Sequence, residues 1–264
     1  MTRRVWDTFM FNNEFDILEC RIRELEEVPN LVHVVVEADV DHQDHPKPYH
    51  FAENRERFAQ WSDRIVSVQA TGLPTLAQDP DPWSREHAQR EHVWAALSDA
   101  ASDDVVLHGD VDEFPTALAV RNFTAPGWSG FKVCHQRLFC FAVDWEYPGS
   151  WPGTVVGHVG DVGEFADMRS MRGFADALPV PLGGWHLSWL GGGDAARRKM
   201  GSFCHPEVRD ILNRQFGDAL DHLDQCYLEG WHVDGKKLLP VDVDETWPKW
   251  IAAGDCPDVW FRPR

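Results

Sequence analysis

The sequence predicts an α/β protein with a mostly parallel central sheet flanked by helices and an irregular, partly helical C-terminal part. Short aliphatic runs alternate with amphipathic stretches over residues 5–115, the succession that builds a parallel sheet. The run Val105-Val106-Leu107 suits a strand buried on both faces. The second half contains more Gly, Pro and Trp and alternates less regularly, so its elements are less sharply defined.

The predicted elements follow one another along the chain. The predicted strands cover residues 5–11, 31–36, 65–68 and 105–110, and the predicted helices cover 13–28, 55–61 and 83–97. Asn13 is expected to cap the first helix, and Pro29 ends it. Residues 130–145 are expected to form one or two strands, 149–163 a Gly/Pro-rich loop with at most a short strand at 154–156, and 202–228 a final helical part.

Composition excludes some classes of partner and location. The formal net charge of −18 argues against a nucleic-acid surface, because phosphate contacts normally depend on Lys and Arg. The six cysteines show no zinc-type spacing and are expected to be reduced and buried. No apolar stretch suits a signal peptide or a membrane span, so the sequence predicts a cytoplasmic protein without a membrane span.

Two aspartates end the fourth predicted strand. Ligands of open α/β sheets bind beyond the carboxyl ends of the strands, where Asp110 and Asp112 lie. Alternate residues of an extended segment point the same way, so both carboxylates are expected to converge on one Mg²⁺ or Mn²⁺ ion. Asp112 is expected to be exposed at the strand end. The competing interpretation is a solvated acidic turn without a ligand.

Several segments together resemble glycosyltransferase family 17, the bisecting N-acetylglucosaminyltransferase family. The matching segments, in the family's order, are Asp7–Arg21 with Glu24 and Leu25, Pro46–Pro48, Trp83–Arg90, Asp110–Pro115, and Gly184–Trp189 with Lys199 behind it. The resemblance spans residues 5 to about 205. It implies a GT-A type fold in one domain over 1–264, with a nucleotide-sugar half (1–115) and an acceptor half (116–264). It also implies a metal-bridged nucleotide-sugar donor, most simply a UDP-sugar, and inverting transfer to a glycan or small-molecule hydroxyl.

The resemblance also implies roles for the acidic motif. Asp112 would ligate the metal directly, and Asp110 would approach the ribose or bind the ion through water. Glu113 would support the ligands from behind. His186 is the first choice for a further ligand, with His205 in reserve, while a structural histidine is the competing interpretation.

Donor binding requires cations for the diphosphate and polar groups for the base and ribose. Arg90 could bind one phosphate, although a plain ion pair with Glu86 four residues earlier is the alternative. Lys199 could cover the other phosphate when its Gly-rich loop closes. The remaining candidates follow the first two strands and are Asn12, Asn13, Glu14 and Glu37.

Inverting transfer also requires a base that takes the proton of the acceptor hydroxyl. Asp144 and Glu146 follow an apolar run and flank Trp145, so they are the candidates, with Asp161 and Glu164 as alternates. Two other classes stay open at this point. A metal-dependent phosphohydrolase would use clustered aspartates, and a non-catalytic sugar-binding module would use the tryptophans.

Overall fold

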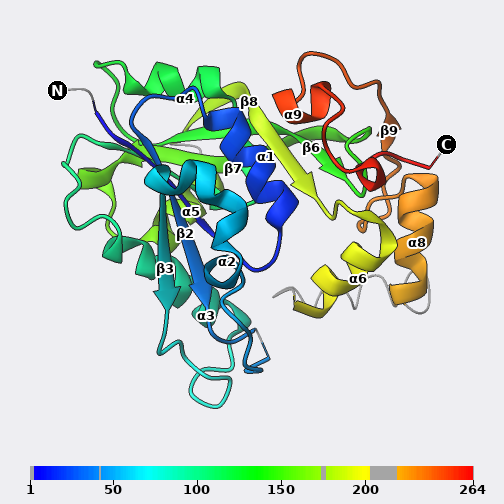
Figure 1. Cartoon of the computed structure of the whole chain (residues 1–264), viewed down its shortest axis with the longest axis horizontal. Coiled ribbons are helices and arrows are strands. Elements are labelled where there is room, and N and C mark those ends of the chain that lie inside the picture. Colours follow the sequence, from blue (N-terminus) through cyan, green and yellow to red (C-terminus); the bar gives the residue numbers. More distant parts are fainter. Residues whose placement is uncertain (1–2, 42, 174–176, 203–218, 264) are drawn as a thin grey trace. The chain divides into compact units, whose positions relative to one another are not determined.

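A computed structural model describes residues 3–41, 43–173, 177–202 and 219–263 (Figure 1). Within these residues lies a nine-stranded sheet in the order β3-β2-β1-β4-β7-β6-β8-β5, with β9 paired to β7. The strands are β1 (Val5–Met10), β2 (Leu31–Ala38), β3 (Ile65–Ala70), β4 (Val105–Asp110), β5 (Glu113–Pro115), β6 (Lys132–Cys140), β7 (Trp145–His158), β8 (Leu178–Ser188) and β9 (Leu239–Pro240). The longer helices are α1 (Phe15–Leu25), α3 (Pro82–Glu91), α4 (Ala117–Thr124), α5 (Phe165–Ser170), α6 (Gly192–Ser202) and α8 (Ala219–Glu229).

Short helical segments complete the structure. They are α2 (His50–Glu53), α9 (Lys249–Ala252), and the 3-10 segments η1 (Arg55–Arg64), η2 (His92–Ala95), η3 (Val159–Asp161), η4 (Met171–Gly173) and η5 (Asp258–Trp260). The predicted α/β class is therefore confirmed. Part of the predicted last helix, together with His205, lies outside the described residues, and α8 accounts for its end.

The chain divides into two compact units. The first unit consists of Met1–Gln136 and Pro152–Gly184, and the second of Arg137–Trp151 and Trp185–Arg264. The boundaries fall inside β6, β7 and β8 rather than at residue 115, where the sequence placed the border between a donor half and an acceptor half. No helix in the described part of the chain is long and apolar enough to cross a membrane.

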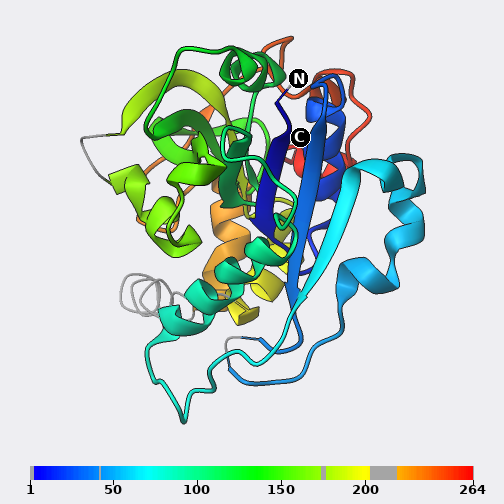
Figure 2. The ribbon, with the colours of Figure 1, turned by 90° about the vertical axis from the view of Figure 1, so that its left-hand side faces the viewer.

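The first unit contains the parallel part of the sheet. β1 pairs in parallel with β2 on one side and β4 on the other, and β2 pairs in parallel with β3. The sheet becomes antiparallel where β4 meets β7. Figure 2 shows β1, β2 and β3 side by side, with α1 and α3 on opposite sides of these strands. Parallel strands of this kind end at one common edge, which is where a ligand site is expected.

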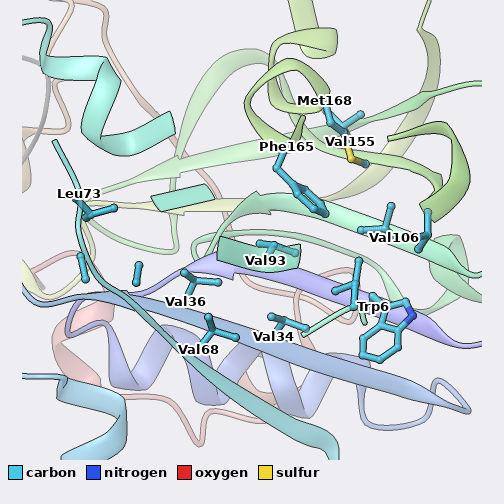
Figure 3. Close-up of a cluster of buried hydrophobic side chains, with 14 of the residues drawn as sticks. Trp6, Val34, Val36, Val68, Leu73, Val93, Val106, Val155, Phe165 and Met168 are labelled. Carbon is cyan, nitrogen blue, oxygen red and sulfur yellow. The ribbon is translucent and has the colours of Figure 1, made fainter. Parts of the chain in front are cut away.

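Alternation along the strands gives the sheet of the first unit two different faces. One face packs Trp6, Val34 and Val106 against η2 and α5, as Figure 3 shows for the cluster that includes Val93 and Phe165. The opposite face packs the intervening strand residues against α1 and α4, in a cluster of Val5, Leu25, Leu31, Val105, Leu107, Val120 and others. Both sides of β4 are thus buried, as its aliphatic run predicted.

Two local predictions are wrong. The first helix begins at Phe15 with Glu14 as its N-cap residue, so Asn13 is not the cap. Residues 149–163 are not mainly a loop, because β7 runs unbroken from Trp145 to His158. The Gly and Pro residues of this segment lie partly in an exposed stretch of the strand, where loop composition and strand geometry are compatible.

The second unit has its own core. Its buried cluster includes Leu138, Trp145, Trp189 and Leu223, with Tyr147, Trp151, Tyr227 and Trp231 packed against it. Gly230, with φ of +69°, ends α8, and a Cβ there would lie 2.9 Å from the Trp145 ring. The cysteines that the structure describes, Cys20, Cys134, Cys140, Cys226 and Cys256, are buried, as predicted.

Candidate active site

β4 ends at Asp110, and the chain then turns through Val111 and Asp112 into β5. The predicted buried strand is confirmed, but two statements about Asp112 are wrong. Asp112 lies in a turn, so the two carboxylates do not follow the alternation of one extended strand. It is also only 5% exposed. A solvated acidic turn therefore does not describe this motif either.

Two arginines from different helices hold the Asp110 carboxylate. Arg90 of α3 donates to Oδ1 at 2.7 Å, and Arg169 of α5 donates to Oδ2 at 2.7 Å. The Asp110 side chain is 38% exposed, whereas those of Arg90 and Arg169 are 2% and 8% exposed. Burial alone would raise the pKa of Asp110, but the guanidinium groups hold it well below its usual range. Asp110 is therefore ionised at neutral pH.

The same arginines bind further carboxylates. Arg90 donates to Glu86 at 2.7 Å, which is the ion pair predicted as the alternative role of Arg90. Arg169 donates to Glu113 at 2.8 Å, and Arg172 lies 3.5 Å from the same Glu113 oxygen. We call Arg90, Arg169 and Arg172, with Asp110 and Glu113, the arginine cluster. Because the Arg90 guanidinium is buried among these partners, it positions Asp110 and does not fit the predicted role of a phosphate ligand.

The opposite face of the sheet supports the turn from below. Arg21 of α1 is fully buried and forms an ion pair with Asp7 of β1. Its Nη1 donates to the carbonyl oxygens of Asp110, Val111 and Glu113 at 2.8, 3.2 and 2.8 Å. One buried guanidinium thus fixes the backbone of the turn that carries Asp112.

A buried histidine links Arg90 to the sheet. Arg90 Nη1 lies 3.2 Å from His108 Nε2, and since a guanidinium can only donate, Nε2 is the acceptor. The proton must then lie on Nδ1, which donates to Thr8 Oγ1 at 2.8 Å. The Thr8 hydroxyl in turn donates to the Leu107 carbonyl at 2.9 Å. Burial is the main cause that holds the pKa of His108 well below its usual value, and the charge of the neighbouring Arg90 is the second cause. The ring is therefore neutral.

Polar residues gather after β1 and near the end of β2 in the first unit. Lys47 donates to the side chain of Asn12 at 3.0 Å, and Glu14 accepts from the backbone N–H groups of Asn12 and Asn13 at 3.0 Å each. Burial lowers the pKa of Lys47, although Glu37 and Glu14 oppose this shift. The structure therefore brings Asn12, Glu14 and Glu37 into the surroundings of Lys47, a residue that the sequence did not nominate.

The side chain of Glu37 holds the start of α2. Its two carboxylate oxygens accept from the backbone N–H groups of Phe51 and Ala52 at 2.6 and 3.1 Å. Burial raises the pKa of Glu37 against these hydrogen bonds. Glu37 thus has a structural role that is compatible with, but does not require, contact with a donor.

The predicted metal ligands do not form a ready site. Among the residues that the structure describes, no group of three or more His, Cys, Asp or Glu side chains could hold a metal ion. Asp110 already binds two guanidinium groups, whose positive charge opposes a divalent cation on the same oxygens. The residues therefore do not fit the expected ligand set as predicted, and Asp110 belongs to the arginine cluster. Asp112 stays the predicted direct ligand.

Two nominated residues lie in the second unit. His186 is 8% exposed, and its ring centroid lies 4.9 Å from that of Trp151. Lys199 lies on α6 with Nζ 5.7 Å from the centre of the Trp189 ring. Gly192 and Gly193 begin α6, and Gly191 and Gly192 have positive φ angles of +105° and +75°. The closure of this segment over a phosphate stays a prediction.

Both nominated bases form ion pairs within the second unit. Asp144 accepts from the backbone N–H and from Nε of Arg262, each at 2.9 Å. Glu146 accepts two bonds from Arg137 at 2.8 and 3.0 Å. A general base needs an oxygen that is accessible to the acceptor hydroxyl, so these contacts favour structural roles for Asp144 and Glu146.

Sequence reasoning missed several site residues. Arg21, Arg169 and Arg172 become recognisable only when helix faces are placed on the sheet, because they lie far along the chain from the turn that they contact. Arg21 did lie inside the Asp7–Arg21 segment, and the buried face of that helix was a signal that could have identified it. Lys47 lay inside the Pro46–Pro48 segment in the same way.

Comparison with known proteins identifies the class. The model of the family described as "Glycosyltransferase family 17" matches residues 1–207. This match covers more than half of the chain, so the chain belongs to glycosyltransferase family 17.

Relatives from human, rat and mouse carry the name beta-1,4-mannosyl-glycoprotein 4-beta-N-acetylglucosaminyltransferase. The human protein is 23% identical over 259 residues, covering 86% of this chain and 47% of the relative. The rat protein is 26% identical over 155 residues, covering 56% of this chain and 28% of the relative. The chain thus spans about half or less of the length of the curated relatives that it matches.

Among solved structures, similarity is weak. A mannosyltransferase from Pyrobaculum calidifontis, solved with GDP-Man and Mn²⁺, has a TM-score of 0.40 at 16% identity, covering 86% of this chain and 71% of that chain. The apo form of glycosyltransferase GlyE from Streptococcus pneumoniae has a TM-score of 0.35 at 11% identity, covering 68% and 45%. TM-scores at this level carry no functional argument.

Proposed function

We propose that this chain transfers N-acetylglucosamine or a related hexose from a nucleotide-diphosphate donor, with UDP-sugars first, to a hydroxyl of a glycan or small molecule. Membership of family 17 supports the reaction class. The single observation that carries the site is the buried charge network at the end of β4, which holds the turn with Asp112 from both faces of the sheet. Groups whose pKa values are shifted by burial and by neighbouring charges gather at functional sites more often than elsewhere in a fold.

The donor would lie at the carboxyl edge of the parallel strands of the first unit. Asn12, Glu14 and Lys47 offer amide, carboxylate and ammonium groups suited to a ribose or base. Arg172, 33% exposed at its side chain, is the most accessible guanidinium of the arginine cluster and is our candidate for the diphosphate. The GT-A type of nucleotide-sugar-binding fold is part of the same proposal.

The reaction has a simple balance. The acceptor oxygen bonds to the anomeric carbon, the bond from that carbon to the diphosphate oxygen breaks, and the diphosphate leaves with the electron pair. The hydroxyl proton passes to a base on the protein. Attack from the face opposite the leaving group would give the inversion implied by the family resemblance.

Metal dependence stays a prediction from the resemblance. An Mg²⁺ or Mn²⁺ ion bound with Asp112 would neutralise charge on the leaving diphosphate. The chain's own residues supply the rest: Arg21 fixes the turn, and Arg90 and Arg169 hold Asp110. The cytoplasmic location also stays a prediction. No observation in the described residues favours the phosphohydrolase or the non-catalytic sugar-binding module.

A thermal-shift panel with UDP-GlcNAc, UDP-glucose, UDP-galactose and GDP-mannose tests the proposal. A ligand at 100 times its Kd stabilises the folded state by about 2.7 kcal/mol, so a specific donor should raise the melting temperature measurably. The panel is run with MnCl2 and with EDTA, and nucleotide release and p-nitrophenyl phosphate hydrolysis are measured in parallel. Phosphate-ester hydrolysis without any response to nucleotide sugars would contradict the proposal and favour the phosphohydrolase.

A further inference from the structure

The backbone carbonyl of Glu113 is held by two buried side chains. Arg21 Nη1 donates to it at 2.8 Å, and the hydroxyl of Thr154 donates to it at 2.9 Å. These two donors can occupy both lone pairs of the carbonyl oxygen. Arg21 reaches the turn from α1, whereas Thr154 reaches it from β7. Strand β7 is therefore a further element, besides α1, α3 and α5, that fixes the turn with Asp112.

A buried amide orients the Thr154 hydroxyl. This hydroxyl has a single proton, which it donates to Glu113, so from a further partner it can only accept. Gln136 of β6 is that partner, because its Nε2 donates to Thr154 Oγ1 at 3.1 Å. Thr154 is 0% exposed and Gln136 is 1% exposed. We call Gln136 and Thr154, with the two hydrogen bonds that lead to the Glu113 carbonyl, the Gln136 relay.

Two glycines make room for the Gln136 relay. A Cβ on Gly153 of β7 would overlap the side-chain amide of Gln136. A Cβ on Gly109 of β4 would lie 3.2 Å from Thr154 Oγ1, which is tighter than an ordinary van der Waals contact. Gly153 is one of the residues that gave this part of β7 the composition of a loop. The structure shows that the glycine is required there because the Gln136 amide fills the place of a side chain.

Packing alone does not explain an amide at position 136. Gln136 Oε1 is buried and has no hydrogen-bond partner among the described residues, and the same holds for Nε of Arg169. Both side chains contact Gly153, whose carbonyl accepts from Arg169 Nη1 at 3.2 Å. A buried acceptor without a partner lowers stability, whereas an apolar side chain of similar size does not. An amide at this place therefore indicates a role other than stability.

We propose that Gln136 is a positioning residue of the donor site and acts through Thr154 on the turn with Asp112, an inference that rests on the proposed function. Gln136 leaves the Thr154 hydroxyl one orientation, toward the Glu113 carbonyl. The hydrogen bonds of Thr154 and Arg21 then fix the backbone of the turn and direct the Asp112 side chain. Gln136 and Thr154 are buried and act on the donor only through the order of this turn. All of these residues belong to the first unit.

Gln136→Met tests the proposal because stability and donor binding should not fall together. The methionine side chain removes the unpaired buried oxygen, so the melting temperature should stay at or above that of wild type. Without the amide, the Thr154 hydroxyl is no longer fixed, and binding of UDP-GlcNAc in calorimetric titration should weaken by about 10-fold or more, the usual cost of removing a group that orients a ligand-binding residue. A residue that only supports the fold would give the reverse, lowered stability with unchanged affinity.

Further variants and a measurement without donor complete the test. Thr154→Val removes the hydroxyl and should weaken donor binding by about 10-fold or more, whereas Thr154→Ser keeps the hydroxyl and should bind the donor as wild type does. Hydrogen exchange of the amides of residues 110–115, measured without donor, should be faster in Gln136→Met and Thr154→Val. Gln60→Met, the same change at an exposed residue of η1, is the matched control with no expected effect on affinity or exchange.

The outcomes separate this inference from the proposed function. If wild type binds the donor and Gln136→Met and Thr154→Val bind it equally well, with unchanged exchange of the turn, the role of the Gln136 relay is overturned and the proposed function is not. A wild type that binds no nucleotide sugar of the panel overturns the proposed function, and this inference falls with it. If Gln136→Met does not fold, the two Thr154 variants decide, and equal donor affinity of Thr154→Val and Thr154→Ser contradicts the relay.

Discussion

Carboxylates of the two units are held by arginine in different ways. In the first unit, Asp110 binds Arg90 and Arg169 from two helices, while Arg21 fixes the same turn from the opposite face. In the second unit, Asp144 is held by the backbone N–H and the side chain of Arg262. An ion pair between one arginine and one carboxylate, such as that of Arg262 with Asp144, joins two segments of the chain. A network that converges from several elements on one turn positions that turn, and this distinction separates a site from a structural pair.

The comparison also shows what an acidic motif does not reveal. Asp110 and Asp144 both follow an apolar run, and each looked suited to chemistry in the sequence. Their partners differ in burial and number, which depends on the packing of distant helices.

The largest effect is expected for the buried pair of the first unit. Arg21→Met leaves buried Asp7 with His33 as its remaining side-chain partner and without a permanent positive charge beside it, and should lower the free energy of unfolding by about 3–5 kcal/mol in urea denaturation. Arg23→Met, on the same helix, removes the partly exposed pair with Glu19 and the contact of the guanidinium with the Trp61 ring, and should cost about 1 kcal/mol or less. Equal losses for the two variants would refute the role assigned to Arg21.

A second effect is expected at the arginine cluster. Arg169→Met leaves Glu113, which is 1% exposed, without its strongest ion pair and should destabilise the protein by about 1–3 kcal/mol. Donor affinity should fall as well, because Asp110 loses one of its two partners. Thermal melts and calorimetric titration with UDP-GlcNAc measure both quantities. Unchanged affinity with lowered stability would reduce the cluster to a structural feature.

A smaller effect is expected for Asp144. The variant Asp144→Asn keeps the shape of the side chain but loses the charge that binds Arg262, which should cost about 1 kcal/mol of stability. Turnover should stay near that of wild type if Asp144 is structural. A fall of about 100-fold in turnover with normal stability would restore it as the base.

A further effect concerns pH. Burial and Arg90 hold the pKa of His108 low, so the unfolded chain takes up a proton near pH 6.5 that the folded chain does not. Stability should therefore fall as the pH drops below 6.5, by up to about 1.4 kcal/mol per pH unit for this group. His108→Gln should flatten the slope measured between pH 7.5 and 5. An unchanged slope would show that His108 does not titrate as described.

Further acidification acts through the aspartates. Burial would raise the pKa of Asp7, but Arg21 and His33 lower it below its usual value. A lowered carboxylate pKa stabilises the folded state above the unfolded value of about 3.9 and loses this contribution as the pH falls through the folded value. Denaturation series at pH 5, 4 and 3 should show this loss, and it should be absent in Asp7→Asn.

Much of the first unit could be predicted from the sequence. Period-two and aliphatic patterns located β1, β2, β3 and β4, because β1, β2 and β4 are almost entirely buried and the end of β3 alternates between buried and exposed residues. β7 was missed because its Gly and Pro residues have loop composition, while pairing with β4 and β9 keeps it extended. Asn13 was expected to cap the first helix, but that helix begins at Phe15, so its N-cap residue is Glu14.

The candidate site was predictable only in part. The edge of the sheet at which Asp110 lies follows from the strand pattern, whereas the turn with Asp112 was predicted as an extended segment. The partners of that turn do not follow from the pattern either, since Arg21, Arg90 and Arg169 reach it through helix packing that local patterns do not encode. Roles assigned to Lys199 and Asp144 depended on the same missing information.

We propose that the turn after β4 forms the donor site and that the carboxylates of the second unit do not. Isothermal titration of UDP-GlcNAc, with the other nucleotide sugars of the panel in turn, compares wild type, Asp112→Asn and Asp144→Asn at matched folded concentration. We expect donor binding by wild type and by Asp144→Asn with similar Kd, and a Kd at least about 10-fold weaker for Asp112→Asn, which corresponds to ~1.4 kcal/mol. Equal affinity of Asp112→Asn and wild type, or loss of binding only in Asp144→Asn, would contradict this account.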